Sequence, residues 1–240
     1  MLFISPPFGN YLNVPKTTPI KGSFTLEPRP GLFGQIYKTL YFSKENNGWV
    51  NKIGLRNKGI DYAIDKYKNS FFPFYRNSVI SIAILEENEI DKFVEKIPPE
   101  MPLEINVSCP NVEHDLVCKK LGKFLNPERK WCSIKLSPKT SSREIDQYYS
   151  EGFRIFHCSN TLPVNDGGLS GPSLIPYTWN LTKTIKQKYS DAIVISGGGI
   201  QNIETMKLYE SIGADHFSIS SVCFNPFRFL SLYTVYCMEY

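Results

Sequence analysis

Short hydrophobic runs alternate with amphipathic stretches along most of this chain of 240 residues. Runs rich in β-branched residues predict strands, and apolar residues spaced three or four apart predict helices. The predicted strands are residues 1–5, 19–26, 78–85, 103–108, 132–137, 154–160, 192–198 and 216–221. The predicted helices are residues 59–69, 88–97, 114–124, 141–152, 173–189, 202–213 and 226–237. The pattern therefore predicts eight strands that are mostly separated by helices.

Two segments near the N-terminus depart from this alternation. Residues 6–18, "PPFGNYLNVPKTT", contain too many helix-breaking residues for a helix, which predicts a reduced first strand–helix unit. Residues 34–54 predict a surface excursion with a hairpin around residues 46–48.

Eight strand–helix units predict an α/β protein with a closed (β/α)8 TIM barrel. Parallel strands need crossover helices, and closure of the sheet removes its edges. An open doubly wound sheet is the alternative, because 240 residues is short for a barrel. The chain contains no linker, repeat or low-complexity segment, so we expect residues 1–240 to form one domain.

Composition adds limits on the class of protein. With 42% hydrophobic and 21% charged residues the chain is typical of globular proteins. The net charge of +4 comes from scattered Lys and Arg, which fits a phosphate-bearing small ligand at least as well as nucleic acid. We expect a small-molecule partner and no nucleic acid. Six cysteines without a C-x-x-C pair predict reduced thiols and no metal site. No apolar run approaches the ~20 residues of a membrane span, so we expect a cytoplasmic protein without membrane binding.

Polar residues recur where the predicted strands end. In a barrel these ends form the rim that carries active sites. Asn, Ser and Gly are also ordinary turn residues, so a single one of them carries little weight. Because such residues recur at the ends of several successive strands, we predict an active site at this rim. The residues are Lys21, Ser23, Asn106, Cys109, Asn111, Lys135, Asn160, Thr161, Gly197, Gly198, Gly199, Ser220 and Ser221.

Two features of the rim suit an anionic ligand. The three glycines of "ISGGGIQN" lie between a strand and a helix, where backbone N–H groups can approach a phosphate, and Ser220 and Ser221 end the next strand. Lys135 lies in a strand otherwise suited to burial. A buried lysine needs a partner, which is either an anionic ligand group or a neighbouring Glu or Asp.

Several motifs together resemble one known family. The motifs are "NKIGLRNKGID" (51–61), "NVSCPN" (106–111), "IKLSP" (134–138), "CSNT" (158–161) with "GGLSG" (167–171), and "SGGGI" (196–200) with "ISS" (219–221). In order and spacing they resemble the dihydroorotate dehydrogenase family, from Ser5 onward, in a shortened form. The resemblance implies an FMN-dependent barrel that oxidises dihydroorotate to orotate in pyrimidine biosynthesis.

The resemblance also implies a catalytic role for Cys109. In this family a cysteine or serine takes the C5 proton of dihydroorotate while the C6 hydride passes to flavin N5. With a cysteine at this position the chain resembles the soluble branch of the family. The membrane-associated branch has a serine there. A packed, inert cysteine is the alternative interpretation of Cys109.

The same resemblance implies two sets of binding residues. The substrate set is Lys21, Asn51, Ile53, Gly54, Leu55, Asn106, Asn111, Asn160 and Thr161. The FMN set is Ser5, Gly22, Ser23, Asn106, Lys135, Ser159, Gly171, Gly198, Gly199, Ser220 and Ser221. The expected partner is the small-molecule substrate, and a homodimer is one option for the assembly.

The chain departs from the family at several positions. Residues 31–39 ("GLFGQIYKT") replace the usual "GNPxPR", and charged residues follow Asn111. Ser220 replaces a glycine, which would strain the backbone if this position required a positive φ. A flavin-binding pseudoenzyme, or an FMN dehydrogenase of another cyclic amide such as a dihydropyrimidine, therefore stays open, as does the electron acceptor.

The direction of Lys21 is ambiguous in this comparison. An ungapped alignment places Gly22, rather than Lys21, where soluble family members carry a lysine. A slip of one residue sends a strand side chain to the opposite face. Ile20, Phe24 and Leu26 share one parity and Lys21, Ser23 and Thr25 the other. We therefore expect the polar set to face inward, with Lys21 pairing with the substrate carboxylate and a small bulge absorbing the extra residue.

Overall fold

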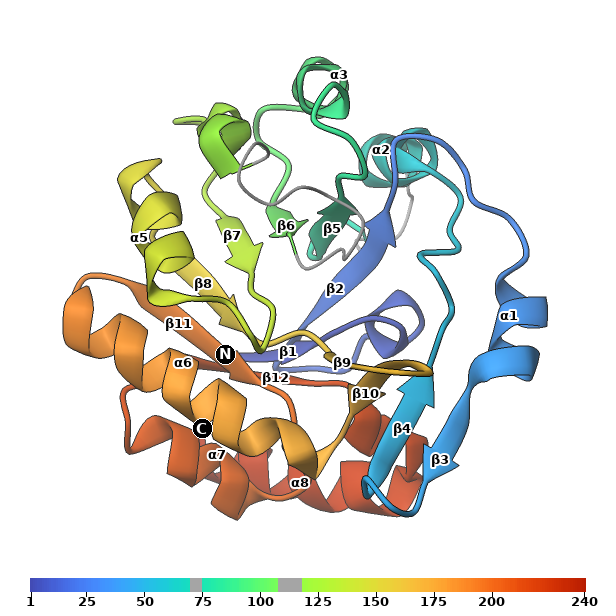
Figure 1. Cartoon of the computed structure of the whole chain (residues 1–240), viewed down its shortest axis with the longest axis vertical. Coiled ribbons are helices and arrows are strands. Elements are labelled where there is room, and N and C mark those ends of the chain that lie inside the picture. The colour runs from blue at the N-terminus through green and yellow to red at the C-terminus, as the bar shows by residue number, and fades with distance from the viewer. Residues whose placement is uncertain (70–74, 108–117) are drawn as a thin grey trace.

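Eight parallel strands close into a barrel in the computed structural model, which describes residues 1–69, 75–107 and 118–240 (Figure 1). Around the barrel the order is β1-β12-β11-β8-β7-β6-β5-β2. The strands are β1 (Leu2–Ile4), β2 (Thr17–Phe24), β5 (Val79–Ala83), β6 (Leu103–Asn106), β7 (Cys132–Lys135), β8 (Ile155–Cys158), β11 (Ile193–Gly197) and β12 (His216–Ile219). The predicted (β/α)8 barrel is confirmed.

Helices and short 3-10 turns connect these strands. The helices are α2 (Ile60–Asn69), α3 (Glu89–Lys96), α5 (Ser142–Ser150), α6 (Ile175–Lys188), α7 (Ile203–Glu210) and α8 (Pro226–Glu239). The 3-10 turns are η1 (Phe8–Asn10), η2 (Cys118–Phe124), η3 (Pro172–Leu174) and η4 (Ser221–Phe224). Only η1 lies between β1 and β2, which confirms the reduced first unit. Among the described residues, no helix has the length and apolar character that a membrane crossing requires.

A small antiparallel sheet stands beside the barrel (Figure 1). Its strand order is β3-β4-β10-β9. The predicted hairpin is β3 (Tyr41–Ser43) with β4 (Gly48–Asn51), whereas β9 (Leu162–Val164) and β10 (Gly167–Ser170) were not expected. Residues that replace the family's usual loop form a helix instead, α1 (Leu32–Thr39).

The barrel interior divides into an apolar part and a polar part. Phe3, Ile20, Val79 and Ile195 form an apolar cluster in the barrel interior. Toward the carboxyl ends the buried side chains are polar, among them Ser81, Glu104, His157 and Ser218. Two larger apolar clusters lie outside the barrel, between the strands and the helices. The polar part of the interior supports the site described below.

The structure corrects the predicted direction of Lys21. Ile20, opposite Val79, lies in the interior cluster, and Lys21, opposite Ile80, points away from it. Its fully buried Nζ donates to the carbonyl of Gly9 at 2.7 Å. The expectation that Lys21 reaches the site is therefore wrong.

The physical reason is the position of the bulge. The pairing of β2 with β5 shifts by one residue between Lys21 and Phe24, so a register irregularity is present as expected. It follows Lys21 rather than preceding it, and Ser23 takes the inward direction, where its Oγ lies 2.9 Å from Ser81 Oγ. Phe24 packs in the outer core, as predicted.

Replacement of Lys21 by methionine should destabilise the protein. Its Nζ donates to the carbonyls of Gly9 (2.7 Å) and Asn10 (3.4 Å), and methionine would leave both acceptors without this donor. We expect Lys21→Met to lower the free energy of unfolding by about 1 to 3 kcal/mol in urea titrations. The exposed Lys44→Met is the control and should change stability little. Equal unfolding midpoints for the two variants would contradict this assignment.

Candidate active site

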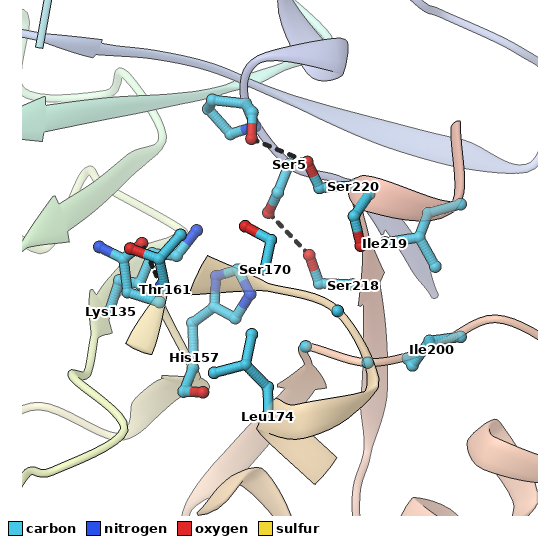
Figure 2. Close-up of a pocket in the computed structure, with 17 residues that line it drawn as sticks. Ser5, Lys135, His157, Thr161, Ser170, Leu174, Ile200, Ser218, Ile219 and Ser220 are labelled. Atoms are coloured by element: carbon cyan, nitrogen blue, oxygen red, sulfur yellow. Dashed lines mark hydrogen bonds between the residues drawn. The ribbon is translucent and has the colours of Figure 1, made fainter. Parts of the chain in front are cut away.

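A pocket opens at the carboxyl ends of β1, β7, β8, β11 and β12, with β10 of the small sheet at its side (Figure 2). It contains about 500 Å³ of space between atoms, part of it open to solvent. The predicted residues that line it are Ser5, Lys135, Ser159, Asn160, Thr161, Gly171, Gly198, Gly199, Ser220 and Ser221.

A chain of amide side chains leads from the pocket wall into the barrel. Asn160 Nδ2 donates to Asn106 Oδ1 at 3.1 Å, and Asn106 Nδ2 donates to Ser23 Oγ at 3.1 Å. The backbone N–H of Thr161 donates to Asn160 Oδ1 at 2.8 Å. Asn106 and Ser23 do not line the pocket themselves, but these bonds fix the direction of Asn160, which does. Amides held in this way can pair with the edge of an amide-containing ring.

Other predicted residues lie away from the pocket lining. Gly22 follows the outward-facing Lys21, and a Cβ on it would lie 2.4 Å from the Ser81 carbonyl oxygen, so only glycine fits. Asn51 ends β4, where it is opposite Gly168 of β10. Ile53, Gly54 and Leu55 lie in the segment after β4 and do not line the pocket. Cys109 and Asn111 are outside the described residues.

Glycines and serines form the other end of the pocket. Gly171, Gly198 and Gly199 have φ values of 138°, 96° and 80°, which favour glycine. Ser220 has a φ of −150°, so the strain expected from a positive φ is absent. Its Oγ donates to the Pro6 carbonyl at 3.0 Å (Figure 2). Hydroxyl groups and tightly turning backbone at one end suit a phosphate or a similar anion.

Three ionisable side chains meet beneath the pocket. Glu104 is fully buried, and its Oε2 lies 2.6 Å from His157 Nδ1. Its Oε1 accepts a hydrogen bond from Ser81 Oγ at 3.0 Å and lies 3.9 Å from Lys135 Nζ. Both partners considered for Lys135 are therefore compatible with the structure, because Lys135 faces Glu104 and also lines the pocket.

The surroundings keep Glu104 ionised. Burial alone raises the pKa of the carboxyl, but the charge of Lys135 and the hydrogen bonds from His157 and Ser81 lower it to about 2, against an ordinary value of 4.5. Burial, with a contribution from Lys135, lowers the pKa of His157, and this effect exceeds the opposing effect of Glu104. The buried group is thus a carboxylate beside a neutral imidazole.

Sequence reasoning missed His157 and Ser218 as pocket residues. Phe156 and Cys158 pack in the outer core, so strand alternation alone places His157 inside the barrel. That signal was available from the sequence. Ser218 lines the same pocket and its Oγ lies 2.7 Å from Ser5 Oγ (Figure 2). In the described part of the chain no three His, Cys, Asp or Glu side chains converge as metal ligands.

Comparisons with known proteins agree with this architecture. The chain is 25% identical over 212 residues to the "Dihydroorotate dehydrogenase B (NAD(+)), catalytic subunit" of Staphylococcus carnosus, covering 77% of this chain and 69% of that protein. It is 26% identical to the protein of the same name from Malacoplasma penetrans, covering 77% and 70%. A solved structure of DHODH from Eimeria tenella in complex with ferulenol matches with a TM-score of 0.65 at 17% identity, covering 87% of this chain and 71% of that one.

The family match extends over most of the chain. The family model described as dihydroorotate dehydrogenase matches residues 16–224, from the start of β2 to the end of η4. The matched segment includes every described pocket residue except Ser5 and Pro6. The chain therefore belongs to the dihydroorotate dehydrogenase family of oxidoreductases.

Proposed function

We propose that this protein is an FMN-dependent oxidoreductase that converts dihydroorotate to orotate in pyrimidine biosynthesis. The observation that carries the proposal is the pocket at the carboxyl end of the barrel, where Lys135 and the oriented amide of Asn160 lie opposite the glycine and serine residues. Active sites of barrel enzymes lie at this end. Its cytoplasmic location and assembly as a homodimer stay predictions.

The pocket residues fit FMN in their chemistry. FMN carries a phosphate, a polyhydroxyl chain and a conjugated ring with amide edges. Lys135 supplies positive charge, Asn160 supplies amide groups, and hydroxyl and glycine residues supply the other end. We expect Lys135 and Ser159 near the ring, and Gly171, Gly198, Gly199, Ser220 and Ser221 at the phosphate. When bound, FMN would supply the capacity to accept a hydride.

The protein's own groups would orient the substrate and move a proton. Asn160, held by Asn106, would pair with the amide edge of the pyrimidine ring. Asn51, Asn111, Thr161 and the segment from Ile53 to Leu55 are the other proposed substrate contacts. Cys109 would take the C5 proton of dihydroorotate as a thiolate. Glu104 would keep Lys135 in place with its charge directed toward the pocket.

A second candidate substrate follows from the direction of Lys21. Lys135 is the single Lys or Arg among the described residues that line the pocket, because Lys21 points away from it. A carboxylate on the substrate would therefore have fewer cations nearby than the sequence predicted. This observation favours a neutral cyclic amide such as a dihydropyrimidine as the alternative substrate. A flavin-binding role without turnover is the remaining alternative.

Flavin reduction tests the proposed activity. We expect the purified protein to contain FMN or to be reconstituted with it, and anaerobic dihydroorotate to bleach the visible flavin absorption. Dihydrouracil, which lacks the carboxylate, is the matched comparison. Bleaching by dihydrouracil alone would establish the second candidate. Flavin that neither compound bleaches would reject both substrates, and a protein that cannot take up FMN would reject the cofactor.

Replacement of Cys109 tests the proposed base. Cys109→Ala should retain FMN while the rate of flavin reduction by dihydroorotate falls by ~10²- to 10⁴-fold, because a general base contributes a factor of this size. Cys237→Ala, which changes a half-buried cysteine of α8, is the control and should reduce at the wild-type rate. The assignment fails if stopped-flow traces of Cys109→Ala and the control coincide.

A further inference from the structure

His157 lines the pocket, and its contact with Glu104 fixes the orientation of its ring. Its side chain is 1% exposed, and Nδ1 lies 2.6 Å from Glu104 Oε2. An ionised carboxylate only accepts hydrogen bonds, so the imidazole proton lies on Nδ1. The other ring nitrogen, Nε2, then carries a lone pair. A hydrogen bond at one ring nitrogen in this way sets the role of the other.

Nε2 lies close to Gly197 of the neighbouring strand β11. A Cβ built on Gly197 would lie 3.2 Å from Nε2 and 2.9 Å from the Ser218 carbonyl oxygen, so a side chain at this position would crowd the nitrogen and glycine does not. Among the residues that the structure describes, none donates a hydrogen bond to Nε2, and this atom is not sealed from the pocket. A buried acceptor without a donor is costly, whereas one facing a ligand is useful.

The position of His157 identifies the part of the ligand it would meet. His157 on β8 is opposite Lys135 on β7 and opposite Ile195 on β11, two residues before Gly197. Figure 2 shows its ring between Lys135 on one side and Ser218 on the other. A ligand with a ring near Lys135 and an anion near Gly198 would therefore extend its connecting chain across His157.

We propose that His157 Nε2 accepts a hydrogen bond from a hydroxyl group of the ribityl chain of FMN. The inference rests on the proposed function, because it takes FMN as the ligand. Glu104 acts through His157 as a positioning residue, since it holds the proton on Nδ1 and the acceptor toward the pocket. The pair would select a polyhydroxyl linker over an apolar linker of the same length.

Binding of FMN analogues tests this role without turnover. The apoprotein is titrated with FMN and with its 2′-, 3′- and 4′-deoxyribityl analogues, and dissociation constants are taken from flavin fluorescence. Wild type should bind at least one deoxy analogue roughly 3- to 10-fold more weakly than FMN, the loss expected for one neutral hydrogen bond. His157→Asn keeps an N–H group for Glu104 but lacks Nε2, so it should bind FMN more weakly and lose this discrimination. Ser211→Ala, an exposed change at the C-cap of α7, is the control.

A second measurement uses the wild-type protein and therefore does not require that His157→Asn folds. The chain has three histidines, so ¹⁵N-imidazole labelling gives few resonances. In wild type we expect the unprotonated Nε2 resonance of His157 to move toward lower frequency when FMN is added, as for an acceptor that gains a donor. His216→Gln would exclude His216 as its source. Equal affinities for all analogues with a stationary resonance would overturn the role of His157, whereas absence of FMN binding to wild type would reject the proposed function as well.

Discussion

The buried carboxylate of Glu104 is the group on which the polar half of the barrel interior depends. Removing a charge from water is expensive unless partners surround it. Glu104 has Ser81 and His157 as hydrogen-bond partners and Lys135 at 3.9 Å. These partners come from β5, β7 and β8, so one charge on β6 holds side chains from four neighbouring strands of the barrel.

The Glu104 carboxylate orients two residues that line the pocket. Lys135 is held with its side chain at the pocket, and His157 is held as a neutral ring that also lines it. Ser81 extends the connection to Ser23, and through Ser23 to Asn106 and the pocket amide of Asn160. The floor of the proposed flavin site is thus one hydrogen-bonded network, which gives well-defined directions to groups that must meet a planar ligand.

The strands were predictable because most of them are short apolar runs buried on both faces, and most helices because each buries one face at a regular spacing. The alternation of side chains did not predict which residues of β2 face inward. The position of a one-residue register shift cannot be read from alternation, and Lys21 faces outward because the shift follows it. The strands β9 and β10 are three and four residues long, and they contain proline and glycine. They are too short to show the alternation of apolar and polar residues that predicts a strand. The pairing of β10 with β4 depends on tertiary contacts, such as the one that requires Gly48 beside Ser170.

The candidate site was predicted unevenly for similar reasons. Residues at strand ends, such as Lys135 and Asn160, follow from the strand assignments and line the pocket. His157 lies one step inside its strand and was overlooked, although alternation with its outward-facing neighbours was visible. Glu104 has no signal of its own in a single sequence, because only the fold shows which charges face it.

The pH dependence of stability tests the central role of Glu104 most directly. Its pKa is lowered from 4.5 to about 2 in the folded protein, so its stabilising contribution is complete above pH 4.5 and is lost as the pH falls toward 2. The free energy of unfolding is measured in urea at pH 6 and pH 3 for wild type, Glu104→Gln and the exposed control Glu95→Gln. The stability gap between wild type and Glu104→Gln should narrow by about 2 kcal/mol over this range, from ~1.4 kcal/mol per pH unit below pH 4.5. A gap that stays constant, as expected for the control, would show that Glu104 is not held as a carboxylate and would contradict the account.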